Sequence, residues 1–149
     1  MGTTSVISFI LKDLNGNESV LTEIYQQNDG YLEGVGRSLC EWLLTKKIIN
    51  GIGINQYTDE YANGYGDLAA QYVRDFKEHG PGNLYITSSY DKNWIDYNYE
   101  VVCDLRDYAL TEEGTPANNL ITIRVNNFGE KPFFVGTPRE LLEYKEPDE

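Results

Sequence analysis

The segment IYQQNDGYLEGVGRSLCEWLL, residues 24–44, changes its hydrophobic pattern from that of a strand to that of a helix. It begins with alternating residues and ends with Leu39, Trp42 and Leu43 on one helical stripe. Between the two halves lie an acid, a tyrosine and three glycines, Gly30, Gly34 and Gly36. The junction is therefore either a turn that only glycine can make or a turn that holds a ligand.

The rest of the chain continues both kinds of pattern. Asn15-Gly16 predicts a hairpin between strands at 5–11 and 20–25. A second helix is expected over 67–78, followed by strands at 84–88, 96–104, 118–127 and, at the edge, 131–136. Thr137, Pro138 and Glu140 predict the start of a last helix. We expect a single α+β domain over residues 1–145, with a largely antiparallel sheet and two or three helices packed on one face, and a frayed tail at 146–149.

The charge of the chain limits its partners. Twelve basic residues stand against twenty-four acidic ones, so the net charge is −12. Such a field repels nucleic-acid phosphates and anionic membranes, and direct binding to either is not expected. The field either keeps the protein soluble or imitates nucleic acid on the basic surface of a partner. The absence of a long apolar run favours a soluble protein in the cytoplasm.

The sequence shows no set of residues typical of catalysis or metal binding. His79 is the only histidine, and neither Cys40 nor Cys103 has a partner at the spacing of a zinc site. Both cysteines are expected to be small buried hydrophobic residues, with a disulfide between them left open. No catalytic residue, metal or cofactor is expected, and enzymatic activity remains an unsupported alternative.

Two glycine-rich segments precede helices and suggest a pocket. Gly34 and Gly36 stand before the first helix, where free N–H groups and Arg37 could receive an anion. Asn63-Gly64-Tyr65-Gly66 stands before the second helix. If the two helix starts converge, they form one pocket for a planar ligand, lined by Asp29, Tyr31, Arg37, Asn63 and Tyr65. The alternative is that the glycines only turn the chain, through positive φ angles, while the tyrosines pack on the sheet.

These segments resemble a family of small proteins encoded by phages and bacteria. Its members begin Met-Gly-Thr-Arg and carry Tyr-Arg-x-x-Asp-Gly-Tyr-Pro-x-Gly-x-Gly and Asn-Gly-x-Gly-Cys-Leu-Ala-Ala-Gln blocks. The similarity covers about residues 1–103 and points to Tyr25, Asp29, Gly30, Tyr31, Gly34, Gly36, Asn63, Gly64, Gly66, Leu68, Ala69, Ala70 and Gln71. Thr4 replaces the family's arginine, Leu32 its proline and Asp67 its cysteine. Loss of the arginine weakens any anion-binding role that the family would imply.

The resemblance implies a phage accessory protein that opposes host defence in the host cytoplasm. The first hypothesis is non-enzymatic sequestration of a small nucleotide-type signal, with the possibility of a homo-oligomer. The expected ligand-binding residues are Tyr25, Asp29, Tyr31, Gly34, Gly36, Arg37, Asn63, Tyr65, Gln71 and Arg74. The alternative is an acidic inhibitor that mimics nucleic acid on a host nuclease or other defence protein, through Asp91, Asp96, Glu100, Asp104, Asp107, Glu112 and Glu113. A second alternative is a hydrolase of the nucleotide signal.

Overall fold

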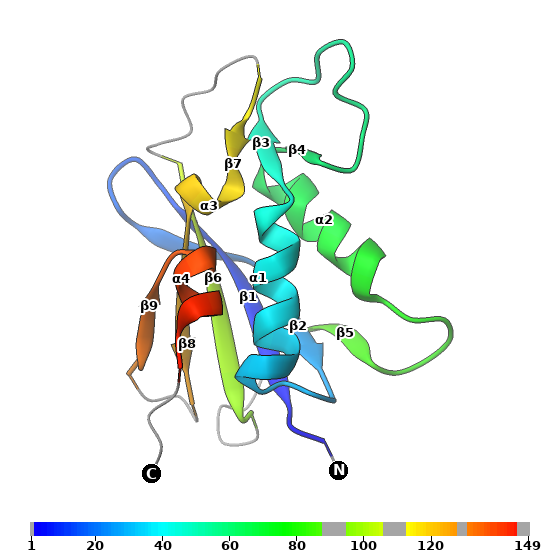
Figure 1. Cartoon of the computed structure of the whole chain (residues 1–149), viewed down its shortest axis with the longest axis vertical. Coiled ribbons are helices and arrows are strands. Elements are labelled where there is room, and N and C mark those ends of the chain that lie inside the picture. Colours follow the sequence, from blue (N-terminus) through cyan, green and yellow to red (C-terminus); the bar gives the residue numbers. More distant parts are fainter. Residues whose placement is uncertain (1, 88–94, 106–112, 128–130, 146–149) are drawn as a thin grey trace.

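The computed structural model describes residues 2–87, 95–105, 113–127 and 131–145, and shows a single α+β domain (Figure 1). Its main sheet has six strands in the order β5-β2-β1-β6-β8-β9. The strands are β1 (Ser5–Lys12), β2 (Glu18–Gln26), β5 (Leu84–Thr87), β6 (Tyr97–Asp104), β8 (Ile121–Asn126) and β9 (Phe134–Gly136). All neighbouring pairs are antiparallel except β1 and β6, which run parallel. The predicted fold class and the largely antiparallel sheet are confirmed.

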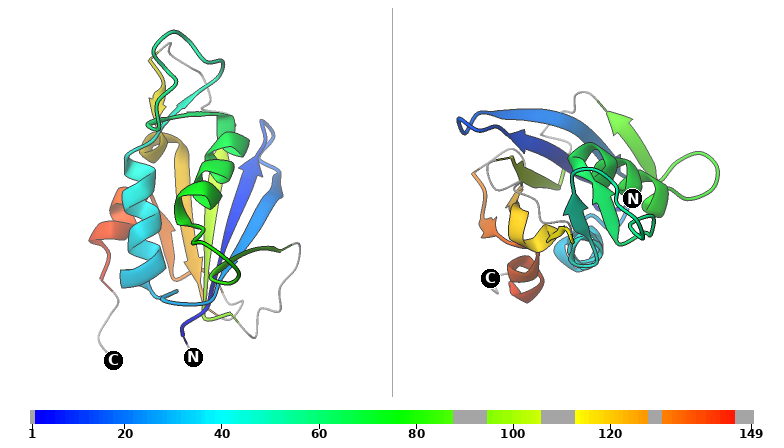
Figure 2. Two further views of the ribbon diagram at one scale, coloured as in Figure 1. Left: turned by 90° about the vertical axis from the view of Figure 1, so that its right-hand side faces the viewer. Right: turned by 90° about the horizontal axis from the view of Figure 1, so that it is seen from above.

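The helices cover one face of this sheet (Figure 2). They are α1 (Arg37–Leu44), α2 (Gly64–Phe76), the one-turn α3 (Ala117–Leu120) and α4 (Pro138–Glu143). The core lies between them and the inward-facing side chains of β1, β6 and β8, including Phe9, Tyr99 and Ile123. Leu39 and Leu43 are buried as their stripe predicted, because a helix with one apolar face gains free energy by packing that face on a sheet.

Two local predictions about turns and caps are also confirmed. Gly16 adopts a φ of +86°, which is the conformation that the Asn15-Gly16 hairpin needs. At the start of α4 the Thr137 side chain accepts from the N–H of Glu140, and the Glu140 side chain accepts from the N–H of Thr137.

A second, three-stranded sheet was not predicted. Its order is β4 (Tyr61–Asn63), β3 (Lys47–Ile49), β7 (Thr115–Pro116). Lys46 lies between the end of α1 at Leu44 and the start of β3. It is buried, with 3% of its surface exposed.

Cys40 and Cys103 are both buried and both free, so the open question of a disulfide is answered for this structure. Burial raises the pKa of the Cys40 thiol to about 12, as expected of a cysteine that behaves as a small hydrophobic residue. No helix within the described residues is both long and apolar enough to cross a bilayer.

Candidate functional site

The glycines of the junction between β2 and α1 are required by close contacts. None of Gly30, Gly34 and Gly36 has a positive φ; Asp29 takes that conformation, at +58°. A Cβ atom on Gly34 would lie 2.1 Å from the carbonyl oxygen of Asp29, and one on Gly36 would lie 3.0 Å from the hydroxyl oxygen of Tyr99. The expectation that these glycines turn the chain through positive φ angles is therefore wrong, because close packing is what excludes a side chain.

The N–H groups of this junction are already occupied. Residues Leu32–Gly36 form a π-helical turn, η1. The N–H groups of Gly34 and Gly36 donate to the Tyr31 carbonyl at 3.0 and 3.4 Å, and that of Val35 donates to the Asp29 carbonyl at 2.7 Å. The turn therefore uses internally the N–H groups that an anion would need. The Arg37 guanidinium lies 3.7 Å from Glu33 and 3.6 Å from Glu41, in two exposed ion pairs on the helix surface.

The two glycine-rich helix starts do not converge. Helices α1 and α2 run in opposite directions, so the start of α1 lies beside the end of α2 (Figure 1). The single pocket expected from the sequence is therefore divided. Asp29, Tyr31 and Gly34 line one cavity, whereas Asn63, Gln71 and Arg74 line another.

The first of these, which we call the junction cavity, has a volume of about 400 Å³. Residues from β2, the junction, α1, α2 and the segment before β5 line it: Gln26, Asn28, Asp29, Tyr31, Gly34, Val35, Ser38, Tyr72, Phe76, Glu78 and Asn83. A volume of this size lies within the range of roughly 300–1,000 Å³ that is usual for small-molecule sites.

Gln26 is a buried polar side chain in the lining of the junction cavity, with 7% of its surface exposed. Its Oε1 accepts a hydrogen bond of 2.6 Å from the hydroxyl of Tyr72. Burial raises the pKa of Tyr72, so this hydroxyl keeps its proton and donates it. The amide Nε2 of Gln26 has no acceptor among the described residues. Because Ser5 Oγ is the only described side-chain atom that is sealed from solvent without a partner, this NH₂ group is reachable by solvent and therefore by a ligand.

The lining of the junction cavity also contains two acidic residues and one exposed aromatic ring. Asp29 and Glu78 contribute carboxylates, and the described lining contains no lysine, arginine or histidine. Tyr31 is 43% exposed, and its hydroxyl lies 3.4 Å from Oδ1 of Asp29. The cavity therefore offers a ring for stacking and acceptors for N–H groups, but no cation for a phosphate.

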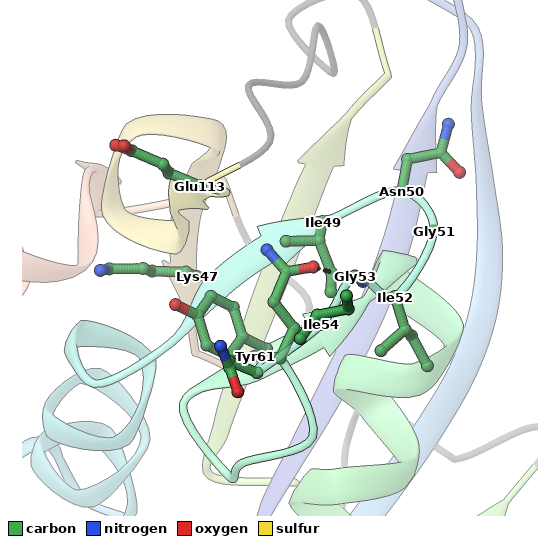
Figure 3. A pocket seen from close by; sticks show the side chains of 11 residues that line it. Lys47, Ile49, Asn50, Gly51, Ile52, Gly53, Ile54, Tyr61 and Glu113 are labelled. Carbon is green, nitrogen blue, oxygen red and sulfur yellow. Dashed lines mark hydrogen bonds between the residues drawn. The ribbon is translucent and has the colours of Figure 1, made fainter.

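A third cavity, distinct from the one lined by Asn63, Gln71 and Arg74, has a volume of about 730 Å³ and lies under residues 50–56 (Figure 3). We call it the loop cavity. Lys47 and Glu113 lie at one end of it and Ile52 at the other. Lys47 pairs with Glu60 at 3.8 Å. Ile54 is 92% exposed and Ile49 is 2% exposed, so the lining of this cavity includes both surface and buried side chains.

Gln71 and Arg74 hold the loop that forms this larger cavity. Gln71 accepts from the buried ammonium of Lys46 at 2.9 Å and donates to the Tyr61 carbonyl at 2.9 Å. Arg74 pairs with Asp59 at 3.2 Å. Burial lowers the pKa of Lys46, whose ammonium also donates to the Asp59 carbonyl. These expected ligand-binding residues therefore anchor residues 59–61 to α2.

The remaining expected residues point elsewhere. Tyr25 lies on the outer face of the sheet, with its ring 5.9 Å from that of Tyr85. Tyr65 is 3% exposed and donates to the Asp104 carbonyl at 3.0 Å. Asn63 accepts from the N–H of Gly51 at 2.8 Å at the base of the loop. Only Asp29, Tyr31 and Gly34 of the expected set line the junction cavity.

The acids proposed for nucleic-acid mimicry lie only partly within the described residues. Asp91, Asp107 and Glu112 lie outside the described residues. Asp96 accepts from the Thr4 N–H at 2.9 Å, and Glu100 pairs with Arg124 at 3.1 Å. Two of the acids thus contact other parts of the chain.

Sequence reasoning did not identify Gln26 and Tyr72 as partners, although both line the junction cavity. The available signal was a glutamine at a strand position that faces the core, opposite Ser5 in the register of β1 and β2. In the part of the chain that the structure describes, no group of three or more His, Cys, Asp or Glu residues is placed to bind a metal ion.

Comparison with known proteins gives no match: no family model, no curated protein and no solved structure is significantly similar to this chain. The resemblance to small phage proteins therefore rests on the quoted motifs alone, and functional inference rests on the cavities.

Proposed function

We propose that this protein is a non-enzymatic ligand-binding protein that takes up a small, planar, nucleotide-type ligand in the junction cavity. The observation that carries the proposal is Gln26, a largely buried residue that lines a cavity of about 400 Å³ and whose Nε2 has no acceptor among the described residues. In the empty protein water can reach this NH₂ group, and a ligand carbonyl or ring nitrogen takes the place of that water.

The lining supports binding rather than hydrolysis. Its described side chains include no histidine, cysteine or lysine. The hydroxyl of Tyr72 is held by Gln26, and its raised pKa keeps it from acting as a base near neutral pH. The carboxylates of Asp29 and Glu78 could accept a proton from water, but the described lining has no lysine, arginine or histidine to stabilise the negative charge that develops in hydrolysis.

The biological setting comes from the motif resemblance. A phage protein that binds a nucleotide signal tightly lowers its free concentration and so opposes a host defence that depends on that signal. This action needs affinity and abundance but no turnover, which agrees with the lining described above.

A thermal-shift screen of the purified protein tests the proposal. The panel contains cyclic dinucleotides, cyclic trinucleotides, ADP-ribose and the four common ribonucleosides. A ligand at a hundred times its dissociation constant adds about 2.7 kcal/mol of stability, which for a chain of this size raises the melting temperature by roughly 5–10 °C. Recovery of the compound unchanged separates binding from hydrolysis.

Two tyrosine variants locate the site. Tyr31→Ala removes the exposed ring of the junction cavity and should abolish the shift, whereas Tyr57→Ala, on the exposed loop, should leave it unchanged. A shift lost only in Tyr57→Ala would assign binding to the loop instead. No shift with any member of the panel would contradict the proposed function.

A further inference from the structure

We infer that the group recognised in the junction cavity is a guanine-type base, in which a carbonyl oxygen stands beside N–H donors, and that any phosphate of the ligand remains outside. This inference rests on the proposed function and specifies its ligand. It is derived from the donors and acceptors that the lining leaves unused.

The first element is the orientation of the Gln26 amide. The buried hydroxyl of Tyr72 has one hydrogen to donate, and Oε1 of Gln26, at 2.6 Å, is the only acceptor found for it among the described residues. This bond fixes Oε1 toward Tyr72 and leaves the NH₂ group for the ligand. A ligand that reaches this NH₂ group should therefore present an acceptor to it.

The second element is the pair of carboxylates. Asp29 and Glu78 both line the cavity, and the contact from the Tyr31 hydroxyl to Asp29, at 3.4 Å, is the only side-chain hydrogen bond found for either carboxylate in the described chain. Both residues are exposed, so water solvates these carboxylates in the free protein, and a ligand that covers them replaces that water best with N–H groups. Phosphates are disfavoured here by like charge, and the net charge of −12 adds to the repulsion.

Guanine meets both requirements on one edge. Its O6 accepts, and its N1–H and N2–H₂ donate side by side, which matches the two oxygens of a carboxylate. Adenine presents an unprotonated ring nitrogen where guanine has N1–H, and that lone pair would face a carboxylate. A simple guanidinium cation would satisfy a carboxylate but leave the Gln26 donor unused. Tyr31, with 43% of its surface exposed, supplies a ring on which a base can stack.

Isothermal titration of the full-length protein with guanosine, inosine, adenosine and GMP tests the inference. Inosine lacks the N2 amino group, so it should bind about tenfold more weakly than guanosine, and adenosine weaker still, because each removes a charge-assisted hydrogen bond. GMP should bind no more tightly than guanosine, since its phosphate gains no cation.

Asp29→Asn provides the matched variant. Asparagine has the same shape and tolerates the left-handed backbone found at this position, where φ is +58°. Its NH₂ group replaces an acceptor, so guanosine affinity should fall about tenfold or more. Glu33→Gln makes the same change of charge on an exposed side chain of η1 that does not line the cavity, and should leave affinity unchanged.

The outcomes separate this inference from the proposed function. If guanosine binds most tightly and this preference is lost in Asp29→Asn, the result supports both the guanine assignment and the proposed ligand-binding function. Equal or tighter binding of adenosine, or an unchanged affinity in Asp29→Asn, overturns the guanine assignment while a nucleoside-binding function stands. A thermal shift with the screening panel but no binding of any nucleoside or GMP also overturns this inference alone. No binding of any compound overturns both.

Discussion

The two glycine-rich helix starts look alike in sequence but differ in physical cause. Before α1, Gly34 and Gly36 are needed because a Cβ would meet the Asp29 carbonyl and the Tyr99 ring. In the first turn of α2, Gly64 is needed because its φ is +85°, and a Cβ on Gly66 would have no neighbour within 4 Å. Glycine content alone therefore does not mark a binding loop.

The partners of the two helix starts differ as well. The start of α1 is close-packed, and its neighbours form the wall of the junction cavity. The start of α2 is held by polar side chains, since the Asn63 N–H donates to Asp67 at 2.8 Å and Asn63 Oδ1 accepts from Gly51 at 2.8 Å. Substitution of each glycine by alanine tests this difference.

Gly34→Ala should have the largest effect. The new Cβ would lie 2.1 Å from a backbone oxygen that also accepts the Val35 N–H at 2.7 Å, so the turn cannot relax without losing that bond. We expect a loss of about 3 kcal/mol or more in the free energy of unfolding, measured by urea titration. A loss below 1 kcal/mol, roughly the average for a point mutation, would show that the turn is not packed as described.

Gly36→Ala should cost less because a side chain can move aside. Its Cβ would lie 3.0 Å from the Tyr99 hydroxyl, which donates to the Gly30 carbonyl at 2.7 Å. We expect a loss of about 1–3 kcal/mol. The double variant with Tyr99→Phe should lose less than the sum of the two single variants, because the clash and the hydrogen bond involve the same oxygen. Additive losses would contradict this contact.

The sequence predicted the larger elements because periodicity is a local property. The stripe of α1, the hairpin at Gly16 and the capping box of α4 each depend on residues close together in the chain, and all three are present. The small sheet was missed because its strands have two or three residues, too few to show a period, and because β3 pairs with β7 far along the chain.

The site was predicted less completely because it depends on long-range packing. No residue pattern within either helix predicts that α1 and α2 run in opposite directions. Because they do, Asp29 and Asn63 line different cavities. The Gln26–Tyr72 bond joins residues 46 positions apart. The buried ammonium of Lys46 likewise depends on packing between segments, because Asp59, Gln71 and Trp42 surround it.

Gly64→Ala tests the conformational requirement at the start of α2. With φ at +85°, alanine should cost about 1–2 kcal/mol through contact of its Cβ with the backbone. Gly64→Asn should cost less, because asparagine tolerates left-handed conformations better than alanine does. Thermal unfolding of both variants gives the comparison. Equal losses for alanine and asparagine would indicate that space, rather than φ, limits this position.

Gly66→Ala should have the smallest effect and the opposite sign. Gly66 lies within the first turn of α2, its φ is not positive, and a Cβ there meets nothing within 4 Å. Alanine lowers the conformational entropy of the unfolded chain and favours the helix, so we expect a gain of about 0.5–1 kcal/mol. For a chain of this size that raises the melting temperature by roughly 1–4 °C. A loss comparable with that of Gly34→Ala would show that α2 also starts in a close-packed turn, and the distinction between the two helix starts would disappear.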